Sequence, residues 1–308
     1  MKKIIIDTDL GDDIDDAFAL LSAIAQPDFD ILGVTTVFKN TVQRARIAKK
    51  IFRLAGRENV PVYTGIDTPM NGVIPKWDYE EVMPDGKIRV HHYKEDMQSE
   101  QIEEGGVDFI LDTAEKYPGE VTLIALGPFT NVAAAILKDK ERFSKLKEVF
   151  VMCGHPGGNY AEWNVRVDPE AASILFNSGL NITAYGLNVT THCKLYEAQQ
   201  EKMKTFTSPA VSLVRDMMDI WIESNNRHAD QPRRYPTMHD PLCVLSYVMR
   251  DICSYDDVKV TVCEKNGVDG YTIVGEEGAA MVVAQNLDVE KFYNAFFTAL
   301  EKVDENKI

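Results

Sequence analysis

The chain has 308 residues, of which 45% are hydrophobic and 26% are charged, and this composition is typical of a globular protein. Its formal net charge of −15 argues against a nucleic-acid partner, because the phosphates would be repelled. The sequence also shows no charged-then-apolar leader and no apolar run of membrane length, so we expect no membrane partner. A small neutral substrate fits these properties better.

The cysteines are too scattered to suggest a disulfide framework or a structural zinc site. Their number is odd and no CxxC pair occurs, which indicates reduced thiols and predicts a cytoplasmic protein. The five residues are Cys153, Cys193, Cys243, Cys253 and Cys263.

Segments with strand and helix patterns alternate along the whole chain. Strands are expected over residues 3–8, 31–37, 60–64, 121–126, 148–153, 181–187 and 258–263. Helices are expected over residues 15–25, 41–55, 101–116, 130–138, 169–178, 208–226, 240–249 and 288–303. This alternation predicts an α/β fold: one domain over residues 1–308, with a mostly parallel open sheet covered by helices on both faces, as in Rossmann-like proteins.

The first predicted strand runs directly into an unusual cluster of acidic residues. The strand is marked by Ile4, Ile5 and Ile6, and the cluster places six aspartates within ten residues: Asp7, Asp9, Asp12, Asp13, Asp15 and Asp16. Helix capping explains one or two of the later four, but it does not explain the two at the end of the strand. Because crowded carboxylates repel one another, we predict a hard divalent cation there, calcium or magnesium.

Polar or glycine-rich residues also follow several later strands. They include Asn40 after the second strand, residues 126–131 after the fourth, residues 152–159 after the fifth, and Asn188 and His192 after the sixth. Ligands of open α/β sheets bind beyond the carboxyl ends of the strands, so this edge is the predicted binding site.

Two long segments interrupt the regular pattern, and long loops in compact domains are usually functional or mobile. Residues 66–100 form a long excursion with several prolines and glycines, and residues 226–238 form a second polar segment that is a candidate lid. Within the loop after the fifth strand, Asn159, Glu162 and Asn164 offer amide and carboxylate groups suited to sugar hydroxyls. A solvated loop explains these three residues equally well.

Two later helix starts carry candidate capping residues. Asp168-Pro169-Glu170 is predicted to be a structural start, with an N-cap aspartate and a proline in the first helical position. His239-Asp240-Pro241 has the same pattern, and a capping role for Asp240 is the simpler interpretation. Alternatively, Asp240 is a remote carboxylate for the cation, and His239 exchanges protons near neutral pH.

Together these motifs give a sequence that resembles the inosine–uridine-preferring nucleoside hydrolase family over nearly its whole length. The opening Asp7-Thr8-Asp9-Leu10-Gly11 and the following Asp15-Asp16-Ala17 are similar to the aspartate signature of the family. Later motifs match in the order of the family: Thr35-Thr36-Val37 with Asn40, Leu126-Gly127-Pro128 with Thr130-Asn131, Met152 with Asn159, Glu162-Trp163-Asn164, Asp168 to Ala172, and His239-Asp240-Pro241.

The resemblance implies the nucleoside hydrolase fold and a calcium-dependent enzyme that cleaves the N-glycosidic bond of ribonucleosides with water. In the matching positions, Asp9 is the base that activates the water and also a calcium ligand. Asp16, Asp240 and the backbone carbonyl of Leu126 are further calcium ligands. His239 matches a histidine proposed in some members to protonate the departing base.

The resemblance also implies a set of ribose-binding residues and an oligomer. Asp15 is expected to bind a ribose hydroxyl, Met152 to lie against the sugar, and the remaining hydroxyls to be held by Asn40, Asn159, Glu162 and Asn164. Members of the family suggest a homodimer or a homotetramer. Purine and pyrimidine nucleosides both remain candidate substrates.

One departure from the family pattern lies in the first turn, where the aspartate pair comes two residues later than usual. Counted from Asp9, Asp13 takes the family position, whereas counted from the following helix Asp15 and Asp16 do. The helix fixes the register, so we expect the second alignment, with Asp13 still close enough to reach the site.

Two other kinds of protein are weighed against this interpretation. A phosphatase of the haloacid dehalogenase type also begins with a strand ending in Asp-x-Asp, which would make Asp7 the nucleophile, but its late lysine and second acidic pair find no match. A non-catalytic nucleoside or sugar binder could retain the same site. An EF-hand is excluded, because the twelfth position counted from Asp7 is Phe18 instead of glutamate.

Overall fold

The computed structural model describes residues 1–75, 79–228, 234–264 and 269–307. Within these residues one ten-stranded sheet forms the centre of the molecule, in the order β4-β3-β2-β1-β5-β6-β7-β10-β8-β9. The strands are β1 (Lys2–Thr8), β2 (Phe29–Thr36), β3 (Val62–Thr64), β4 (Glu103–Glu104), β5 (Val121–Ala125), β6 (Glu148–Met152), β7 (Ile182–Tyr185), β8 (Ser254–Val262), β9 (Thr272–Gly275) and β10 (Ala279–Gln285).

Most neighbouring strands of this sheet are parallel, and only β8 pairs antiparallel with its neighbours β10 and β9. From β1 the chain proceeds outward through β2, β3 and β4, and then returns to place β5 on the other side of β1. The strand order therefore reverses between β1 and β5. In an open parallel sheet, such a reversal leaves a crevice at the carboxyl ends of the two strands.

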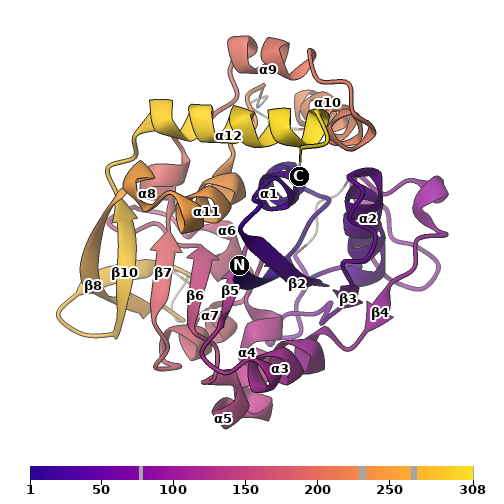
Figure 1. Cartoon of the computed structure of the whole chain (residues 1–308). Helices are drawn as coiled ribbons and strands as arrows, with labels where there is room; N and C mark the ends of the chain where they lie inside the picture. The colour runs from indigo at the N-terminus through magenta and orange to yellow at the C-terminus, as the bar shows by residue number, and fades with distance from the viewer. Residues whose placement is uncertain (76–78, 229–233, 265–268, 308) are drawn as a thin grey trace.

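Helices cover both faces of the sheet, as Figure 1 shows with α12, α11 and α1 above it and α3, α4 and α5 below it. The α-helices are α1 (Asp15–Ile24), α2 (Thr41–Leu54), α3 (Gly106–Lys116), α4 (Thr130–Lys138), α5 (Lys140–Phe143), α6 (Trp163–Val167), α7 (Pro169–Phe176), α8 (Leu187–Thr190), α9 (Glu197–Met203), α10 (Pro209–His228), α11 (His239–Val248) and α12 (Val289–Asp304). Two short 3-10 helices cover Glu95–Met97 and Arg250–Ile252.

Strand β1 lies between two hydrophobic cores, one on each face of the sheet. Ile4 and Ile6 pack into the core beneath α1, α11 and α12, whereas Ile5 packs into the core beside α3, α4 and α7. Successive side chains of a strand point to opposite faces, so a run of three isoleucines is what a strand buried on both faces requires. The predicted α/β class, the mostly parallel sheet and the helices on both faces are confirmed.

All seven predicted strands are present, but three strands were not expected. Strand β10 lies inside the sheet between β7 and β8, β9 forms one edge, and β4 forms the other. The helix predicted over 101–116 begins at Gly106, because residues 103–104 pair with β3 as strand β4. The short helices α5, α6, α8 and α9 were also missed.

The long excursion over residues 66–100 folds back against the start of the chain. A turn at residues 83–86 is flanked by a bridge between Val82 and Ile88, and the amide of His92 donates to the carbonyl oxygen of Gly11 at 2.9 Å. In the candidate lid over 226–238, residues 229–233 lie outside the described part of the chain.

Two further features of the described residues concern the cysteines and the helices. All five cysteines are free thiols, and four of them are buried. Among the described residues, no helix is both long and apolar enough to cross a bilayer.

Candidate active site

Of the six N-terminal aspartates, Asp7 lies within β1 and the other five follow the strand, and their environments differ. Strand β1 ends at Thr8 and α1 begins at Asp15, so the intervening residues form a turn at the carboxyl end of the strand. Gly11 adopts a φ of +120°, and a Cβ at this position would come within 2.4 Å of Val90 Cγ1. Glycine is therefore required for the turn to pack against the long excursion.

Asp15 and Asp16 of the first turn of α1 meet Asp240 of α11 in a buried triad. One carboxylate oxygen from each residue lies within 4.8 Å of the other two, and the three residues are 3–4% exposed. The amide of Asp240 donates to Asp15 Oδ2 at 3.2 Å, which joins chain segments 225 residues apart. The carboxyl of Asp16 also accepts a hydrogen bond from the Thr8 hydroxyl.

The triad fits a cation that supplies the missing positive charge. Burial and mutual repulsion raise the pKa values of Asp15, Asp16 and Asp240 well above those of ordinary aspartates. Ionising all three buried carboxyls is costly unless a positive charge lies among them. All the donor atoms are oxygens, which favours a hard divalent ion.

Asp9 lies next to this triad, between β1 and the chain that leaves β5. A Cβ on Gly127 would lie 2.9 Å from both the amide nitrogen and Oδ1 of Asp9, so the Asp9 carboxylate packs directly against residue 127. Burial raises the pKa of Asp9 to about 6. The charge of Asp9 in turn helps to raise the pKa values of Asp16 and Asp240. The structure thus brings together the four predicted acidic residues at one point of the crevice.

Asp7 has a different environment, which argues for a structural role. Its Oδ1 accepts hydrogen bonds from Thr35 Oγ1 at 2.5 Å and from Asn131 Nδ2 at 2.7 Å. Asn131 also donates to the carbonyl of Thr36 at 3.1 Å and accepts from the amide of Ile66 at 2.8 Å. Asp7 and Asn131 therefore connect β1, β2 and α4 beneath the site.

The backbone carbonyl of Leu126, a predicted cation ligand, accepts a hydrogen bond from Asn164 Nδ2 at 2.5 Å. The same amide donates to the carbonyl of Met152 at 3.1 Å and lies 3.7 Å from Met152 Sδ. Three residues predicted at the site thus form one buried contact group at the ends of β5 and β6. A carbonyl oxygen has two lone pairs, so Leu126 can accept this bond and still ligate an ion.

Two other predicted sugar ligands also cap helices. Asn40 caps α2 by accepting the amide of Gln43 at 3.1 Å, and Glu162 caps α6 by accepting the amides of Asn164 at 2.8 Å and Val165 at 3.3 Å. Burial raises the pKa of Glu162 to about 7. Asn159 instead lies on an exposed loop, where its carbonyl accepts the hydroxyl of Tyr271 at 2.7 Å.

The interpretation of Asp240 as a helix cap is wrong. Helix α11 begins at His239, its N-cap is Met238, and no side chain caps it. Asp240 is already inside the first turn, where its side chain joins the triad. His239 is half-buried, and its Nδ1 forms a 2.7 Å hydrogen bond with Thr190 Oγ1 at the end of α8.

The predicted cap at Asp168 is confirmed, and this residue has a second role. Its Oδ1 accepts the amide of Ala171 at 3.2 Å, with Pro169 in the first turn of α7. Its Oδ2 accepts the hydroxyl of Thr130 at 2.5 Å and the amide of Met70 at 3.0 Å. Asp168 therefore also connects the start of the long excursion to the first turns of α4 and α7.

Comparison with known proteins agrees with this geometry. The family model described as inosine-uridine preferring nucleoside hydrolase matches residues 4–294. The chain belongs to this family. Uridine nucleosidase 1 of Arabidopsis thaliana is 34% identical over 285 residues, which cover 89% of this chain and 82% of the relative.

Solved nucleoside hydrolases share the fold. A plant nucleoside hydrolase superposes with a TM-score of 0.84 at 26% identity, covering 97% of this chain and 98% of the other. The purine-preferring ribonucleoside hydrolase of Gardnerella vaginalis gives a TM-score of 0.83 at 27% identity, covering 99% of each chain. This nucleoside hydrolase thus has an α/β fold and is similar both to a uridine nucleosidase and to a purine-preferring enzyme.

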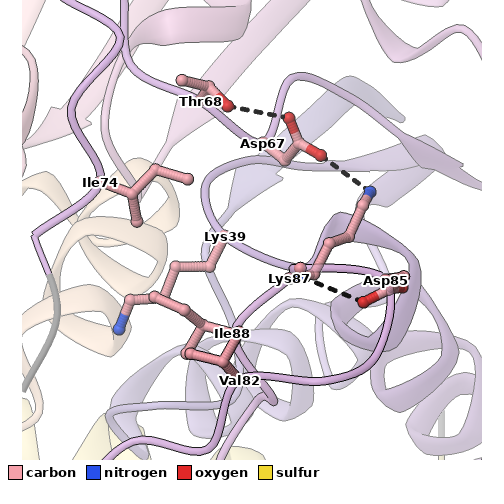
Figure 2. Close-up of a pocket in the computed structure, with 9 residues that line it drawn as sticks. Lys39, Asp67, Thr68, Ile74, Val82, Asp85, Lys87 and Ile88 are labelled. Atoms are coloured by element: carbon pink, nitrogen blue, oxygen red, sulfur yellow. Dashed lines mark hydrogen bonds and ion pairs between the residues drawn. The ribbon is translucent and has the colours of Figure 1, made fainter. Parts of the chain in front are cut away.

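A cavity of about 390 Å³ lies outside the acidic cluster of this nucleoside hydrolase, within the long excursion. Figure 2 shows the pair Asp67–Lys87, 2.8 Å apart, on one side of the cavity, while the ammonium of Lys39 points away from that pair. The Lys39 ammonium is instead 3.1 Å from Asp12 Oδ2 and 2.5 Å from Glu80 Oε1. The residues that line the cavity include none of the predicted cation ligands.

Sequence reasoning missed Arg44, the largest fully buried polar side chain described in this nucleoside hydrolase. Arg44 lies on the buried face of α2 with Ile47, Ala48 and Ile51, at helical spacing. A charged residue in that apolar series is a signal that the sequence contained. It indicates a partner of opposite charge, which the structure identifies as Asp12, 2.8 Å from Arg44 Nη2 and with a side chain that is 29% exposed.

Proposed function

We propose that this protein hydrolyses the N-glycosidic bond of ribonucleosides with the help of a bound calcium ion, releasing ribose and the free base. The observation that carries the proposal is the buried triad Asp15, Asp16 and Asp240, with Asp9 beside it, at the point where the strand order reverses. Membership of the nucleoside hydrolase family supplies the reaction class.

The proposed calcium ligands are the carboxylates of Asp9, Asp16 and Asp240 and the carbonyl of Leu126. The all-oxygen donor set and its assembly from three separate chain segments favour calcium, which accepts six to eight oxygens in adaptable geometry, over magnesium. When bound, this ion supplies the positive charge that orients vicinal ribose hydroxyls and lowers the pKa of a water. We assign Asp15 to a ribose hydroxyl and not to the cation, because its Oδ2 already accepts a hydrogen bond from the amide of Asp240.

In the proposed reaction, Asp9 takes the proton of the attacking water. The contact with Gly127 holds the Asp9 carboxylate beside the triad, and Asp9 stays partly exposed to solvent. Breaking a ribosyl C–N bond builds positive charge on the sugar, as in glycoside hydrolysis, and the buried carboxylates around Asp9 stabilise that charge. Glu162 is one of them, since its pKa responds to the charge of Asp9.

His239 is proposed to deliver a proton to the departing base. Its hydrogen bond to Thr190 fixes the imidazole at the start of α11, next to Asp240. A positioned acid contributes about 10²–10⁴-fold to such a step, because the base leaves poorly as an anion.

We propose that residues at and after the carboxyl ends of β2 and β6 hold the sugar. Asn40, Glu162 and Asn164 are buried, and Met152 packs against the last of these. Asn159 would reach the sugar only if its exposed loop closes over the ribose.

Several finer assignments belong to the same proposal. We propose one catalytic domain over residues 1–308, a homodimer or homotetramer, a cytoplasmic location and a role in nucleoside salvage. The free thiols support the location, and the family supports the other assignments.

The proposal is tested by a reducing-sugar assay on inosine, uridine, cytidine, adenosine and guanosine, with calcium and with a strong chelator. We expect ribose and free base to appear with calcium only and with no need for phosphate. Asp9→Ala should abolish turnover while the fold survives, whereas the exposed, remote Asp251→Ala should behave as the wild type.

Other outcomes would contradict the assignment. Near-normal kcat in Asp9→Ala would remove Asp9 as the base. Tight ribonucleoside binding in calorimetry without any product would indicate a binding protein. Release of phosphate from p-nitrophenyl phosphate would indicate a phosphatase.

A further inference from the structure

The two extra residues of the first turn, Asp12 and Asp13, have no place in the proposed ligand set. Asp12 does not join the triad, because its carboxylate points to the other side of the turn. There Oδ2 lies 2.8 Å from Arg44 Nη2 and 3.1 Å from Lys39 Nζ. Both cations have almost no solvent exposure, with side chains that are 0% and 2% exposed.

Arg44 uses its donors on the backbone of the catalytic turn. Its Nη1 donates to the carbonyl of Leu10 at 2.7 Å and also to the carbonyl of Asp9, and its Nε donates to the carbonyl of Phe38 at 2.7 Å. Together with the Asp12 ion pair, every nitrogen of the guanidinium has a partner. A planar guanidinium can hold four acceptors in a fixed arrangement, which an ammonium cannot reproduce.

The loop that follows β2 adopts an unfavourable backbone to complete this arrangement. Phe38 and Lys39 are consecutive non-glycine residues with φ values of +68° and +57°. A left-handed backbone is unfavourable for residues other than glycine, so the surrounding contacts must hold both residues. The result is that the carbonyl of Phe38 faces Arg44 and the ammonium of Lys39 faces Asp12.

Asp9 is consequently held from two sides. Arg44 fixes its carbonyl from the α2 side, and Gly127 lies against its amide and carboxylate from the β5 side. The direction of the Asp9 side chain therefore depends on where Arg44 holds the backbone of the turn.

We infer that Arg44 is a positioning residue that aims Asp9 at the cation and the attacking water, and that Asp12 is its counter-ion instead of a cation ligand. The inference rests on the proposed function of Asp9. It explains the longer turn, because Asp12 needs the additional residues to reach Arg44 and Lys39. It also separates Asp12, which forms ion pairs within the protein, from the proposed cation ligands Asp9, Asp16 and Asp240.

The test compares Arg44→Met, Arg44→Lys and the double variant Arg44→Met/Asp12→Asn with Arg53→Met. Arg53 is the matched control, since it lies on the same helix and forms its own ion pair, with Glu100 at 2.6 Å. The measurements are kcat and KM at saturating calcium, and calcium affinity of the chelator-treated protein by titration calorimetry.

We expect Arg44→Met to lower both kcat and calcium affinity by about 10–100-fold, the range for residues that orient metal ligands. Arg44→Lys should regain thermal stability but little of kcat, because one ammonium cannot hold both carbonyls. The double variant also removes the Asp12 carboxylate, which in Arg44→Met keeps Lys39 but has lost its partner Arg44, so it should regain stability without regaining kcat. Arg53→Met should keep the kcat and calcium affinity of the wild type.

The inference is overturned if Arg44→Met keeps wild-type kcat and calcium affinity, or if the double variant regains kcat, because Arg44 would then only balance charge. If Arg44→Met does not fold, Arg44→Lys and the double variant decide the question in the same way. An inactive wild type would refute the proposed function, whereas the calorimetric comparison would still test the positioning of Asp9.

Discussion

Replacing Asp240 by asparagine should stabilise the ion-free protein while removing its response to calcium. Asp240 contributes one of three carboxylates whose oxygens lie within 4.8 Å of one another. At this separation and an effective dielectric constant of about 20, two unit charges repel by about 3 kcal/mol. Asparagine is nearly isosteric and removes two such pairs.

The full repulsion is not realised, because the buried carboxyls retain protons. Their folded-state pKa values are raised, so the folded protein binds protons that the unfolded chain releases. This penalty is absent at acidic pH and grows as the pH rises above the unfolded value of 3.8. We therefore expect a gain of about 1–3 kcal/mol for Asp240→Asn in chelator at pH 8, and a smaller gain at pH 5.

The assay is thermal unfolding with chelator or with calcium, at both pH values. The gain at pH 8 corresponds to a Tm rise of about 2–6 °C. Calcium at a hundredfold excess over its Kd should stabilise the wild type by about 2.7 kcal/mol and the variant hardly at all. The exposed Asp257→Asn serves as the control and should follow the wild type. A variant that is less stable than the wild type in chelator at pH 8, or that gains as much from calcium, would refute the reasoning.

Three further predictions concern the neighbours of the triad. Gly127→Ala introduces a Cβ at 2.9 Å from Asp9 Oδ1, so steady-state kinetics should show kcat reduced about 10–100-fold, and an unchanged kcat would exclude the close contact. Calcium binding at pH 6 should release about one proton or more per chain, because burial raises the pKa of Asp9 to about 6 and the pKa values of Asp16 and Asp240 well above those of ordinary aspartates. Calorimetry in buffers of different ionisation enthalpy measures this release, and zero release would contradict the prediction. Thr190→Val removes the hydroxyl that bonds to His239 Nδ1, so the rate of inosine hydrolysis should fall about 10-fold. Hydrolysis of p-nitrophenyl riboside should keep its rate, because its leaving group needs no proton. Equal effects on both substrates would argue against His239 as the acid.

The parts of the fold that were predictable are those encoded in neighbouring residues. Ile4 to Ile6 indicated a strand buried on both faces, and Asp168-Pro169 indicated a helix start. Strand β10 was missed because its place between β7 and β8 is fixed by pairing with distant strands. Strand β4 consists of two exposed glutamates, which give no strand signal.

The same distinction between local and long-range signals applies to the candidate site. The aspartates of the first turn stand out in the sequence, but the meeting of Asp15 and Asp240 joins residues far apart in the chain. The local pattern around Asp240 favoured a cap, because capping rules consider only neighbouring residues. Arg44 was overlooked for a similar reason, since its partners Asp9, Leu10 and Asp12 lie more than thirty residues earlier.

The most direct test of the account is a crystal structure of the calcium-loaded protein, with the ion located by anomalous scattering. The account predicts one calcium per chain with carboxylate oxygens of Asp9, Asp16 and Asp240 and the carbonyl of Leu126 at about 2.3–2.6 Å. No ion in this crevice, or an ion held by Asp12 in place of Asp240, would contradict it.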